Sequence, residues 1–587
     1  MPLPFDWATR RASATLIIRM PEFSCGLVWR DNIVKSRLRD FSKSDITLRS
    51  LATGVVFACI AAGTSQIAMA QKAREAVRTP DFAPAMIDHM QKMRRYRDAD
   101  HGAQPTPRII DRFRVDMDPK GALASFQPNG ATITSNNAFF KDMGTNGRTC
   151  FTCHQPQSGW TITPGDVAER FERSAGKDPI FRLVDGATCP NDNVSTLHAK
   201  RRAYKLLIDK GLVRIGLAVP ATAEFKVEVK PGDDPYGCNT SPDTGLAVGI
   251  VSTYRRPLPS TNVGFLSTVM WDGRESSANG LDADLTSQAR DATLGHAQAA
   301  TSPTDAQLAE IVAFQKGIFT AQIFDKKAKF LTDDNGRGGP VALSQQEFFI
   351  GINDPLGLNP KEIPFTSQIF DLYRPWLNAG ERHEHGDHST PMASEELLRN
   401  VNFTDSWRHN DHERGMVSEH RRSVARGEEI FNNTRINITG VSGLNDDLSI
   451  PNIPGFCGTC HDSPNVGHHS VKAPLDIGVP DAGDNKPPVL DISGLPVFTI
   501  TCQLKDGPLA GKVYKVTDAG RAMVSGKCKD IGRFKGPILR GLASRAPYFH
   551  NGSAATLRDV VDFYDQRFAI GLTHKEKTDL VNFLNTL

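Results

Sequence analysis

Two short stretches of this 587-residue chain share one pattern: Cys150-Phe151-Thr152-Cys153-His154 and Cys457-Gly458-Thr459-Cys460-His461. Each reads C-x-x-C-H, the attachment pattern of c-type haem. The two thiols add to the porphyrin vinyl groups, and the histidine that follows ligates the iron. Two intervening residues let one helical turn meet both vinyl groups. The pattern therefore predicts two covalently bound haem c groups, with His154 and His461 as iron ligands.

The same cysteine pairs could instead form disulfides or half of a zinc site. A zinc site would need partner cysteine pairs at short spacing, and the sequence has none. Because a histidine follows each pair, haem attachment is the favoured interpretation.

The net charge bears on the partners of the protein, and the N-terminal sequence bears on its location. Its net charge is only +3 and its basic residues form no long block, so we expect no nucleic-acid partner. Residues 51–70 are moderately apolar and end in Ala68-Met69-Ala70, an A-x-A cleavage pattern. We expect residues 1–70 to be a signal-peptide region, with the true start downstream of Met1, and the mature protein to be periplasmic. An uncleaved membrane anchor is the alternative.

An even number of cysteines is left once those of the signal region and of the haem motifs are set aside. Of the ten in the sequence, Cys25 and Cys59 would leave with the signal and four would hold haem. In an oxidising compartment, spare cysteines favour disulfides. Sequence proximity pairs Cys189 with Cys238 and Cys502 with Cys528, and free buried thiols are the alternative.

The chain divides into a lead-in, two haem units and a linker. Residues 71–130 read as a polar, partly helical lead-in. A first c-type haem domain over residues 131–390 carries long insertions, one with a strand-like alternation at residues 225–229. Residues 391–420 form a linker within a region rich in histidine and charge, including residues 383–388 and 409–412. This region could bind a metal or be a solvated linker. A second haem domain occupies residues 421–587.

Helical signals flank both motifs. We expect a helix after Ser302 with Pro303 at its first position, and a short amphipathic helix at residues 423–431. Residues 556–563 place Leu557, Val560, Val561 and Tyr564 on one face, and a capping box from Thr573 to Glu576 opens a last helix. The predicted fold class is mainly α, with two c-type cytochrome domains, loop-rich insertions and a few short strands.

Four blocks in this order resemble the superfamily of bacterial di-haem cytochrome c peroxidases and MauG. They are the two C-x-x-C-H motifs, Met270-Trp271-Asp272-Gly273-Arg274 between them, and the segment 537–564, which contains Ala546-Pro547-Tyr548-Phe549-His550-Asn551-Gly552. The resemblance implies two c-type domains that face each other. Peroxide would bind at the N-terminal haem, the C-terminal haem would pass electrons, and Trp271 would couple them. A core tryptophan is the other interpretation of Trp271.

Tyr564 falls where typical peroxidases of this superfamily supply methionine as distal ligand of the second haem, and where MauG-like members supply tyrosine. Thioether ligation favours Fe(II), whereas phenolate favours Fe(III) and higher oxidation states. Tyr564 is therefore a candidate ligand of the second iron, or else a core tyrosine.

One segment departs from the superfamily. Where its members usually present N-P-x-E-M, whose glutamate acts on peroxide, this chain has Ala292-Thr293-Leu294-Gly295-His296-Ala297-Gln298. His296 could exchange a proton with peroxide, and Gln298 could only hydrogen-bond. His296 could instead ligate iron or be structural.

The resemblance also implies calcium between the haem domains. Asn262 and Pro547 are its candidate ligand positions, and Arg545 stands where the superfamily has a small polar residue.

Together these features predict an oxidoreductase that reduces hydrogen peroxide with electrons from a small periplasmic donor such as a c-type cytochrome. A homodimer is a common assembly in the superfamily. Two alternatives stay open: oxidation of another substrate, as MauG-like proteins and rubber oxygenases perform, and electron transfer without catalysis.

Overall fold

The computed structural model of the protein describes residues 106–379 and 410–587. These residues belong to one compact unit, Thr79–Leu587, which contains both predicted haem domains. The predicted signal region with Cys25 and Cys59, and residues 383–388 of the histidine-rich region, lie outside the described residues. Within the described ranges, no helix combines the length and apolar character needed to cross a membrane.

The described residues form helices and short strands joined by long loops. The α-helices are α3 (Pro164–Ser174), α4 (Leu197–Ala203), α5 (Lys205–Lys210), α6 (Leu281–Gly295), α7 (Asp305–Lys316), α8 (Pro340–Leu343), α11 (Asp411–Asn433), α12 (Asn445–Leu448), α13 (Ala522–Ser525), α14 (Leu557–Arg567) and α15 (His574–Leu584). The strands are β1 (Ile109–Ile110), β2 (Phe113–Met117), β3 (Gly121–Phe126), β4 (Thr132–Ile133), β5 (Val213–Ala218), β6 (Phe225–Glu228), β7 (Ile250–Arg255), β8 (Phe319–Asp325), β9 (Lys329–Phe330), β10 (Ile436–Thr439), β11 (Asn452–Gly455), β12 (Phe498–Cys502) and β13 (Val513–Val516). The strands are short, as predicted, but more numerous than the few expected.

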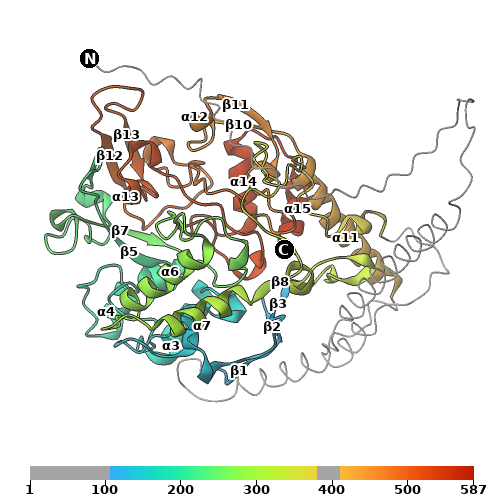
Figure 1. Ribbon diagram of the computed structural model, residues 1–587, viewed down its shortest axis with the longest axis horizontal. Helices are drawn as coiled ribbons and strands as arrows, with labels where there is room; N and C mark the ends of the chain where they lie inside the picture. Colours follow the sequence, from blue (N-terminus) through green and yellow to red (C-terminus); the bar gives the residue numbers. More distant parts are fainter. Residues whose placement is uncertain (1–105, 380–409) are drawn as a thin grey trace, which may run out of the picture. The chain divides into compact units, whose positions relative to one another are not determined.

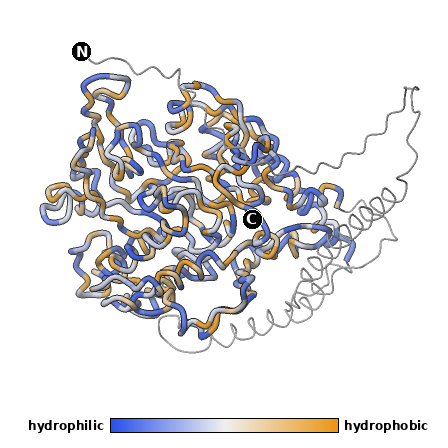
Figure 2. The backbone as a smooth tube through the Cα atoms, viewed as in Figure 1, coloured by the Kyte–Doolittle hydropathy of each residue, from blue (hydrophilic) through white to orange (hydrophobic). Residues whose placement is uncertain are grey.

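Figure 1 shows helices α3, α4, α6 and α7 gathered in one region and α11, α14 and α15 in another. Along the tube in Figure 2, hydrophobic and hydrophilic residues alternate over short distances and form no long apolar run. This pattern is that of amphipathic elements, each of which buries one face in a shared core.

The described end of the lead-in is extended, and the prediction of a partly helical lead-in is wrong there. Strands β2 and β3 pair with each other, and β3 pairs with β8 in the order β2-β3-β8-β9. Phe113, Val115 and Phe126 are buried against Ile323 and Phe330. The strands form because these side chains gain a partner surface supplied by β8, which comes far later in the chain.

A second sheet joins the two predicted haem domains. The strand expected near residues 225–229 is confirmed as β6, and it pairs with β12 in the order β13-β12-β6. Strand β6 lies in the first domain and β12 in the second. The insertion therefore connects the two domains and does not project as a separate loop.

Helix α11 is longer than predicted. Its first residues, 411–420, lie in the predicted linker, so that part of the linker is helical, with Asn410 as N-cap. The helix lies very close to α15 at Gly427, where a Cβ atom would overlap the carbonyl oxygen of Asp579. Only glycine permits this approach.

Local sequence signals set the starts of three helices. Helices α14 and α15 begin with capping boxes, Thr556 with Asp559 and Thr573 with Glu576, the second as predicted. Helix α7 also begins with a capping box, Thr304 with Gln307, so Pro303 precedes the cap. The prediction of Pro303 as first helical residue is wrong because Thr304 satisfies the free N–H groups better.

Both predicted disulfides are confirmed. Cys189 is bonded to Cys238 and Cys502 to Cys528, with Cα–Cα distances of 5.3 and 5.9 Å. The first ties the loop before α4 to the segment before β7, and the second joins β12 to the region after α13.

Candidate haem sites

Each C-x-x-C-H motif folds into a single tight turn. Residues Cys150–Thr152 and Cys457–Thr459 form 3-10 helices. The backbone N–H of His154 donates to the carbonyl of Cys150 at 3.1 Å, and that of His461 to Cys457 at 3.1 Å. One turn therefore holds two thiols and an imidazole together, the arrangement that the spacing predicts.

The two imidazoles are held in the same way. The Nδ1 atom of His154 lies 2.9 Å from the carbonyl oxygen of Trp160, and that of His461 lies 2.9 Å from the oxygen of Gly467. A carbonyl can only accept, so Nδ1 carries the proton and Nε2 keeps its lone pair. This second contact is the one that orients metal-ligating histidines in proteins.

Burial sets the protonation of both motifs. It lowers the pKa of His154 and of His461 to about 4, and it raises the pKa of Cys150, Cys457 and Cys460 to about 12. Burial also raises the pKa of Cys153. At neutral pH the imidazoles are therefore neutral, which is the form that ligates iron.

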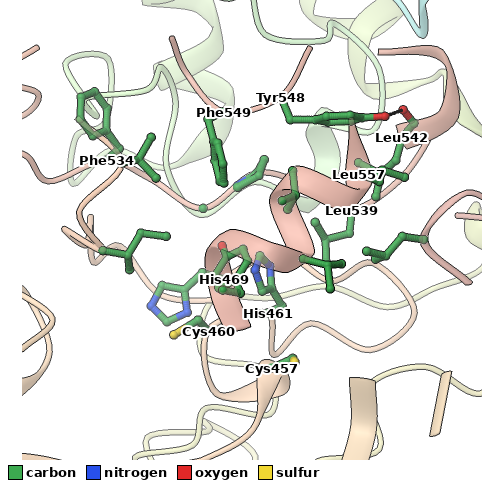
Figure 3. Close-up of a pocket in the computed structure, with 18 of the residues that line it drawn as sticks. Cys457, Cys460, His461, His469, Phe534, Leu539, Leu542, Tyr548, Phe549 and Leu557 are labelled. Atoms are coloured by element: carbon green, nitrogen blue, oxygen red, sulfur yellow. Dashed lines mark hydrogen bonds between the residues drawn. The ribbon is translucent and has the colours of Figure 1, made fainter. Parts of the chain in front are cut away.

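A largely apolar cavity of about 260 Å³ opens at the second motif (Figure 3). Cys457, Cys460 and His461 line it from one side. Helix α14 lines it with the face predicted from the sequence: Leu557, Val560, Val561 and Tyr564. Tyr564 is half-buried, and its hydroxyl makes no hydrogen bond to any described residue. Burial raises the pKa of Tyr564.

The charged residues that line this cavity are all basic. They are Arg256, Lys535 and Arg545, and no carboxylate is present among the described lining residues. Burial lowers the pKa of Arg256 to about 9, of Lys535 to about 7 and of Arg545 to about 10. Buried cations without anions are costly. His550 Nε2 in the same cavity is also buried without a hydrogen-bond partner. This donor set fits haem, whose apolar ring carries two anionic propionates.

Trp271 lies at the edge of the same cavity. Its indole N–H donates to the carbonyl of Arg256 at 2.8 Å, and its ring lies 6.2 Å from the His550 ring in an edge-to-face arrangement. The Lys535 ammonium lies 5.5 Å from the indole centroid. Trp271 is therefore a fixed aromatic side chain beside the second candidate haem site, and its coupling role stays a prediction.

His296 lies beside the first motif. It caps the C-terminus of α6, and its Nδ1 lies 2.5 Å from a carboxylate oxygen of Asp185. Arg148 donates to the other oxygen of Asp185 at 2.6 Å. A charge on His296 contributes to the lowered pKa of His154, which places the two imidazoles in one electrostatic environment. Nε2 of His296 makes no hydrogen bond to any described residue.

Gln298 differs from His296 in its surroundings. Its side chain is exposed, and its Oε1 accepts a hydrogen bond from Asn146 at 3.2 Å. The structure thus brings His296, Asp185 and Arg148 together and leaves Gln298 at the surface. Sequence reasoning missed Asp185 and Arg148, since no local pattern links residues 111 positions apart.

The positions predicted for calcium have structural contacts. The Asn262 amide donates to the carbonyl of Thr320 at 2.8 Å and accepts from its N–H at 2.9 Å. Arg545, two residues before the predicted position Pro547, donates to the carbonyls of Ile538 and Gly541. Across the described residues, no group of three or more His, Cys, Asp or Glu side chains gathers as a metal site. Calcium binding stays a prediction.

Comparison with known proteins gives partial matches. No protein-family model matches the chain. Over 140 residues it is 34% identical to Cytochrome-c peroxidase IdrP2 of Denitromonas iodatirespirans, a match covering 23% of this chain and 36% of the relative. Over 145 residues it is 30% identical to Cytochrome-c peroxidase IdrP1 of Pseudomonas sp. (strain SCT), covering 22% and 36%. The matches thus span about a third of the length of these curated relatives, and they confirm the predicted resemblance.

Among solved structures, the chain has a weak likeness to a MauG-like protein associated with microbial copper homeostasis. The identity is 15% and the TM-score 0.31, over 77% of this chain and 86% of that one.

Proposed function

We propose that this chain, which resembles the di-haem cytochrome c peroxidases and MauG, is a periplasmic oxidoreductase that reduces hydrogen peroxide beside the first motif. The observation that carries the proposal is the His296–Asp185 pair, held against the first motif by Arg148 and within electrostatic reach of His154. Haem iron, when bound at the two motifs, supplies the redox chemistry and a coordination position for peroxide. Electrons come from a small donor such as a c-type cytochrome and pass the second motif and Trp271.

His296 moves the proton in this proposal. Its Nδ1–H is donated to Asp185, so Nε2 carries a lone pair. Nε2 accepts a proton from one peroxide oxygen and returns it to the other, which makes water a leaving group. Histidine suits this role because it exchanges protons near neutral pH.

Asp185 and Arg148 hold His296 in position. Burial alone would raise the pKa of Asp185, but Arg148 and His296 together lower it. Asp185 is therefore an anion at neutral pH and fixes the tautomer and ring orientation of His296.

Tyr564 is the proposed distal ligand of the second haem iron. It lies on α14 and lines the same cavity as Cys457, Cys460 and His461. A phenolate there would favour the oxidised state.

Stopped-flow spectroscopy of the holoprotein with hydrogen peroxide tests the proposal. We expect a rapid Soret change and turnover with a reduced c-type cytochrome. The His296→Gln variant should react about 10²- to 10⁴-fold more slowly. The His198→Gln variant is the matched control because His198 is an exposed histidine on α4. A wild-type protein without Soret change or turnover would rule the activity out.

Electron transfer without catalysis is a second candidate function. The contact between His296 and Asp185 favours it as well. A histidine whose Nδ1 is bound to a carboxylate and whose Nε2 is unpartnered resembles a metal ligand. His296 would then close the first iron site. Electron paramagnetic resonance distinguishes the two: a high-spin ferric signal that cyanide converts supports the enzyme, and two low-spin signals that resist cyanide support the carrier.

Oxidation of a different substrate is a third candidate, favoured by Tyr564 in place of a thioether ligand. A stable complex of the ferrous protein with O₂ would support an oxygenase, and its absence would favour the peroxidase.

A further inference from the structure

A second cavity, of about 690 Å³, lies in the first haem domain between α4 and the strand β5. Apolar side chains form part of its wall, among them Phe181, Leu183 and Val194. Four basic residues complete the lining: Lys177, Arg182, Lys200 and Arg214. The described residues that line it include no Asp or Glu. None of the proposed haem-attachment residues lines it.

The four basic side chains contact only neutral groups. Arg182 Nε donates to the carbonyl of Asn146 at 2.8 Å, and Arg214 donates to the carbonyl of Val184 at 2.7 Å. Lys200 donates to the carbonyl of Ala175 at 3.3 Å, and the Lys177 ammonium makes no hydrogen bond to any described residue. Within the part of the chain that the structure describes, no carboxylate forms an ion pair with any of the four, although Asp185 and Asp192 attract Arg214 from a longer distance.

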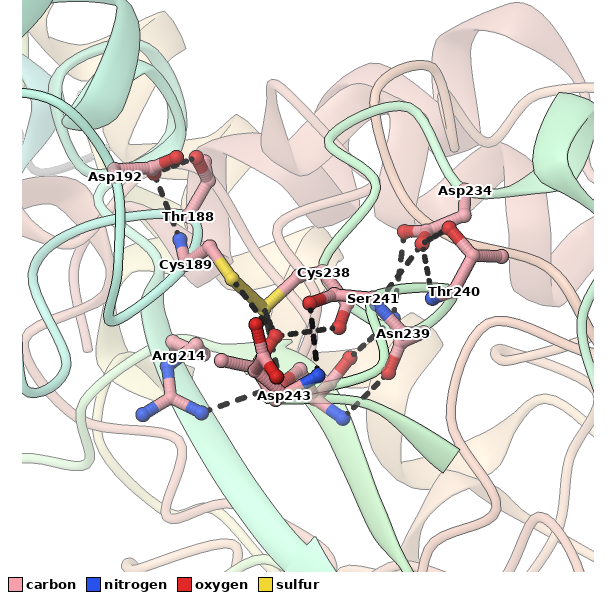
Figure 4. The surroundings of a disulfide bond; sticks show 12 residues. Thr188, Cys189, Asp192, Arg214, Asp234, Cys238, Asn239, Thr240, Ser241 and Asp243 are labelled. Atoms are coloured by element: carbon pink, nitrogen blue, oxygen red, sulfur yellow. Dashed lines mark hydrogen bonds between the residues drawn. A yellow bond between two sulfur atoms is a disulfide. The ribbon is translucent and has the colours of Figure 1, made fainter. Parts of the chain in front are cut away.

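Nearby carboxylates already have other partners. Asp192 accepts from the Thr188 hydroxyl at 2.7 Å and from the backbone N–H of Cys189 at 2.8 Å. Figure 4 shows these contacts above the disulfide, with the Arg214 guanidinium on the far side of it. Asp185 is bound to Arg148 and His296.

Other arginines of the same region do have acidic partners. Arg170 pairs with Asp178 at 2.5 Å, and Arg201 on α4 pairs with Glu172 at 2.6 Å. The four cations at the cavity therefore lack the carboxylate contact that Arg170 and Arg201 have.

Of the four cations, Arg214 has the least favourable electrostatic surroundings. Its Nε is buried without an acceptor, and burial lowers its pKa. Asp185 and Asp192 attract this half-buried guanidinium but neither contacts it, so a bound anion would offset part of the free energy that its burial costs. The guanidinium fork matches a carboxylate, and the cavity has the volume typical of small-molecule sites.

We propose that this cavity binds a carboxylate, held by Arg214, Arg182, Lys177 and Lys200, with the apolar body of the ligand against Phe181 and Leu183. The carboxylate has two candidate sources. One is a free small organic acid. The other is a propionate of the haem at Cys150 and Cys153, since Cys153 packs against the same hydrophobic cluster as Leu183 and Val194. The first source does not depend on peroxidase activity.

Isothermal titration calorimetry of the holoprotein with sodium benzoate tests the first source. Wild type should bind benzoate, and benzamide, its neutral isostere, should bind at least about tenfold more weakly. The Arg214→Gln and Lys177→Gln variants should each weaken benzoate binding about tenfold or more. The Arg201→Gln variant is the matched control, because Arg201 is on the same helix as Lys200 but pairs with Glu172.

Spectroelectrochemistry of the same variants tests the second source. If a haem propionate fills the site, wild type does not bind benzoate, and Arg214→Gln lowers the reduction potential of the first haem while Arg201→Gln does not. Equal binding of benzoate and benzamide would overturn the proposal. So would a protein that neither binds benzoate nor changes potential in Arg214→Gln. Because neither readout uses peroxide turnover, failure of the proposed enzyme activity is distinguished from failure of this site.

Discussion

The first and second haem motifs differ in what lies around the histidine, although the turn that carries it is the same. In both, Nδ1 lies 2.9 Å from a carbonyl oxygen six residues further along the chain. In both, a phenylalanine ring packs near the imidazole: Phe139 at 5.9 Å from His154 and Phe431 at 6.2 Å from His461.

A second histidine near a carboxylate influences both imidazoles, but the contact is close and ion-paired only at the first motif. His296 and Asp185 form an ion-pair-like contact beside His154, and Arg148 neutralises the carboxylate. Beside His461, the His469 imidazole lies 3.4 Å from Asp462, and no Lys or Arg of the described residues pairs with that carboxylate. The cavity there has largely apolar walls, the phenol of Tyr564 and, as fixed charges, only basic groups. A site that moves protons needs the first kind of environment, and a site that only passes electrons suits the second.

This difference shows that five residues set the geometry of a haem turn, while distant segments set its chemistry. The predictions below separate the two motifs in order of expected effect.

The largest effect is expected from removal of the thiols. Replacing Cys457 and Cys460 together with alanine should reduce the pyridine haemochrome yield from two equivalents to one, because no thioether bond can form there. The matched double variant at Cys150 and Cys153 should lose the other equivalent. If either double variant kept both haems, that motif would not be an attachment site.

The next largest effect concerns Arg255, which joins the two haem domains. Its guanidinium lies 2.5 Å from Asp272 in the first domain and 2.6 Å from Asp518 in the second, and all three side chains are buried. Arg255→Met leaves buried Asp518 without its cation and buried Asp272 with Arg274 alone, so the free energy of unfolding in urea should fall by about 3–5 kcal/mol. Arg337→Gln, which breaks the exposed pair with Asp371, should cost about 0–1 kcal/mol. Equal losses would contradict this.

The same cluster gives a pH dependence. Burial alone would raise the pKa of Asp272, but Arg255 and Arg274 lower it from 3.8 to about 2. A carboxyl whose pKa is lower in the folded state stabilises the fold above pH 3.8, and this contribution is lost as the pH falls towards 2. In Arg255→Met the carboxyl loses its main cation. The free energy of unfolding of Arg255→Met should therefore change less than that of the wild type as the pH falls from 3.8 towards 2. Unfolding in urea at a series of pH values measures this.

The sequence predicted features that depend on neighbours in the chain. The two haem turns, the Thr573–Glu576 capping box and the cavity-facing side of α14 each rest on spacings of a few residues. The two disulfides also followed from proximity. Pro303 shows the limit of such reasoning, because two adjacent helix-start signals competed and the Thr304 capping box won.

Features formed by distant segments could not be predicted. The strand at residues 225–229 was expected, but its partner Phe498–Cys502 was not. Likewise His296 was chosen as a candidate without Asp185, which fixes its tautomer. Burial and pairing of this kind depend on the whole fold, and no single-sequence pattern records them.

A smaller effect is expected from Asp185→Asn at the first motif. The amide of this variant can still contact the His296 imidazole but no longer stabilises its protonated form. The reaction with peroxide should slow about tenfold to a hundredfold. The control is Asp178→Asn, which removes another buried carboxylate near the same motif, one paired with Arg170 and not with an imidazole. If both variants slowed the reaction with peroxide alike, Asp185 would have only a structural role.

The smallest effect on peroxide reactivity is expected from Tyr564→Phe at the second motif. If the phenol ligates the second iron, its loss removes a donor that favours Fe(III), so the reduction potential of that haem should rise. The rate of the first step with peroxide should stay close to wild type, because His296 and Asp185 are untouched. Tyr548→Phe is the matched control: Tyr548 lines the same cavity, but its hydroxyl donates to the carbonyl of Leu542 at 2.9 Å. A potential that rises in Tyr548→Phe and not in Tyr564→Phe would mean that Tyr564 is a core residue, and that the second site differs from the first only in its apolar walls.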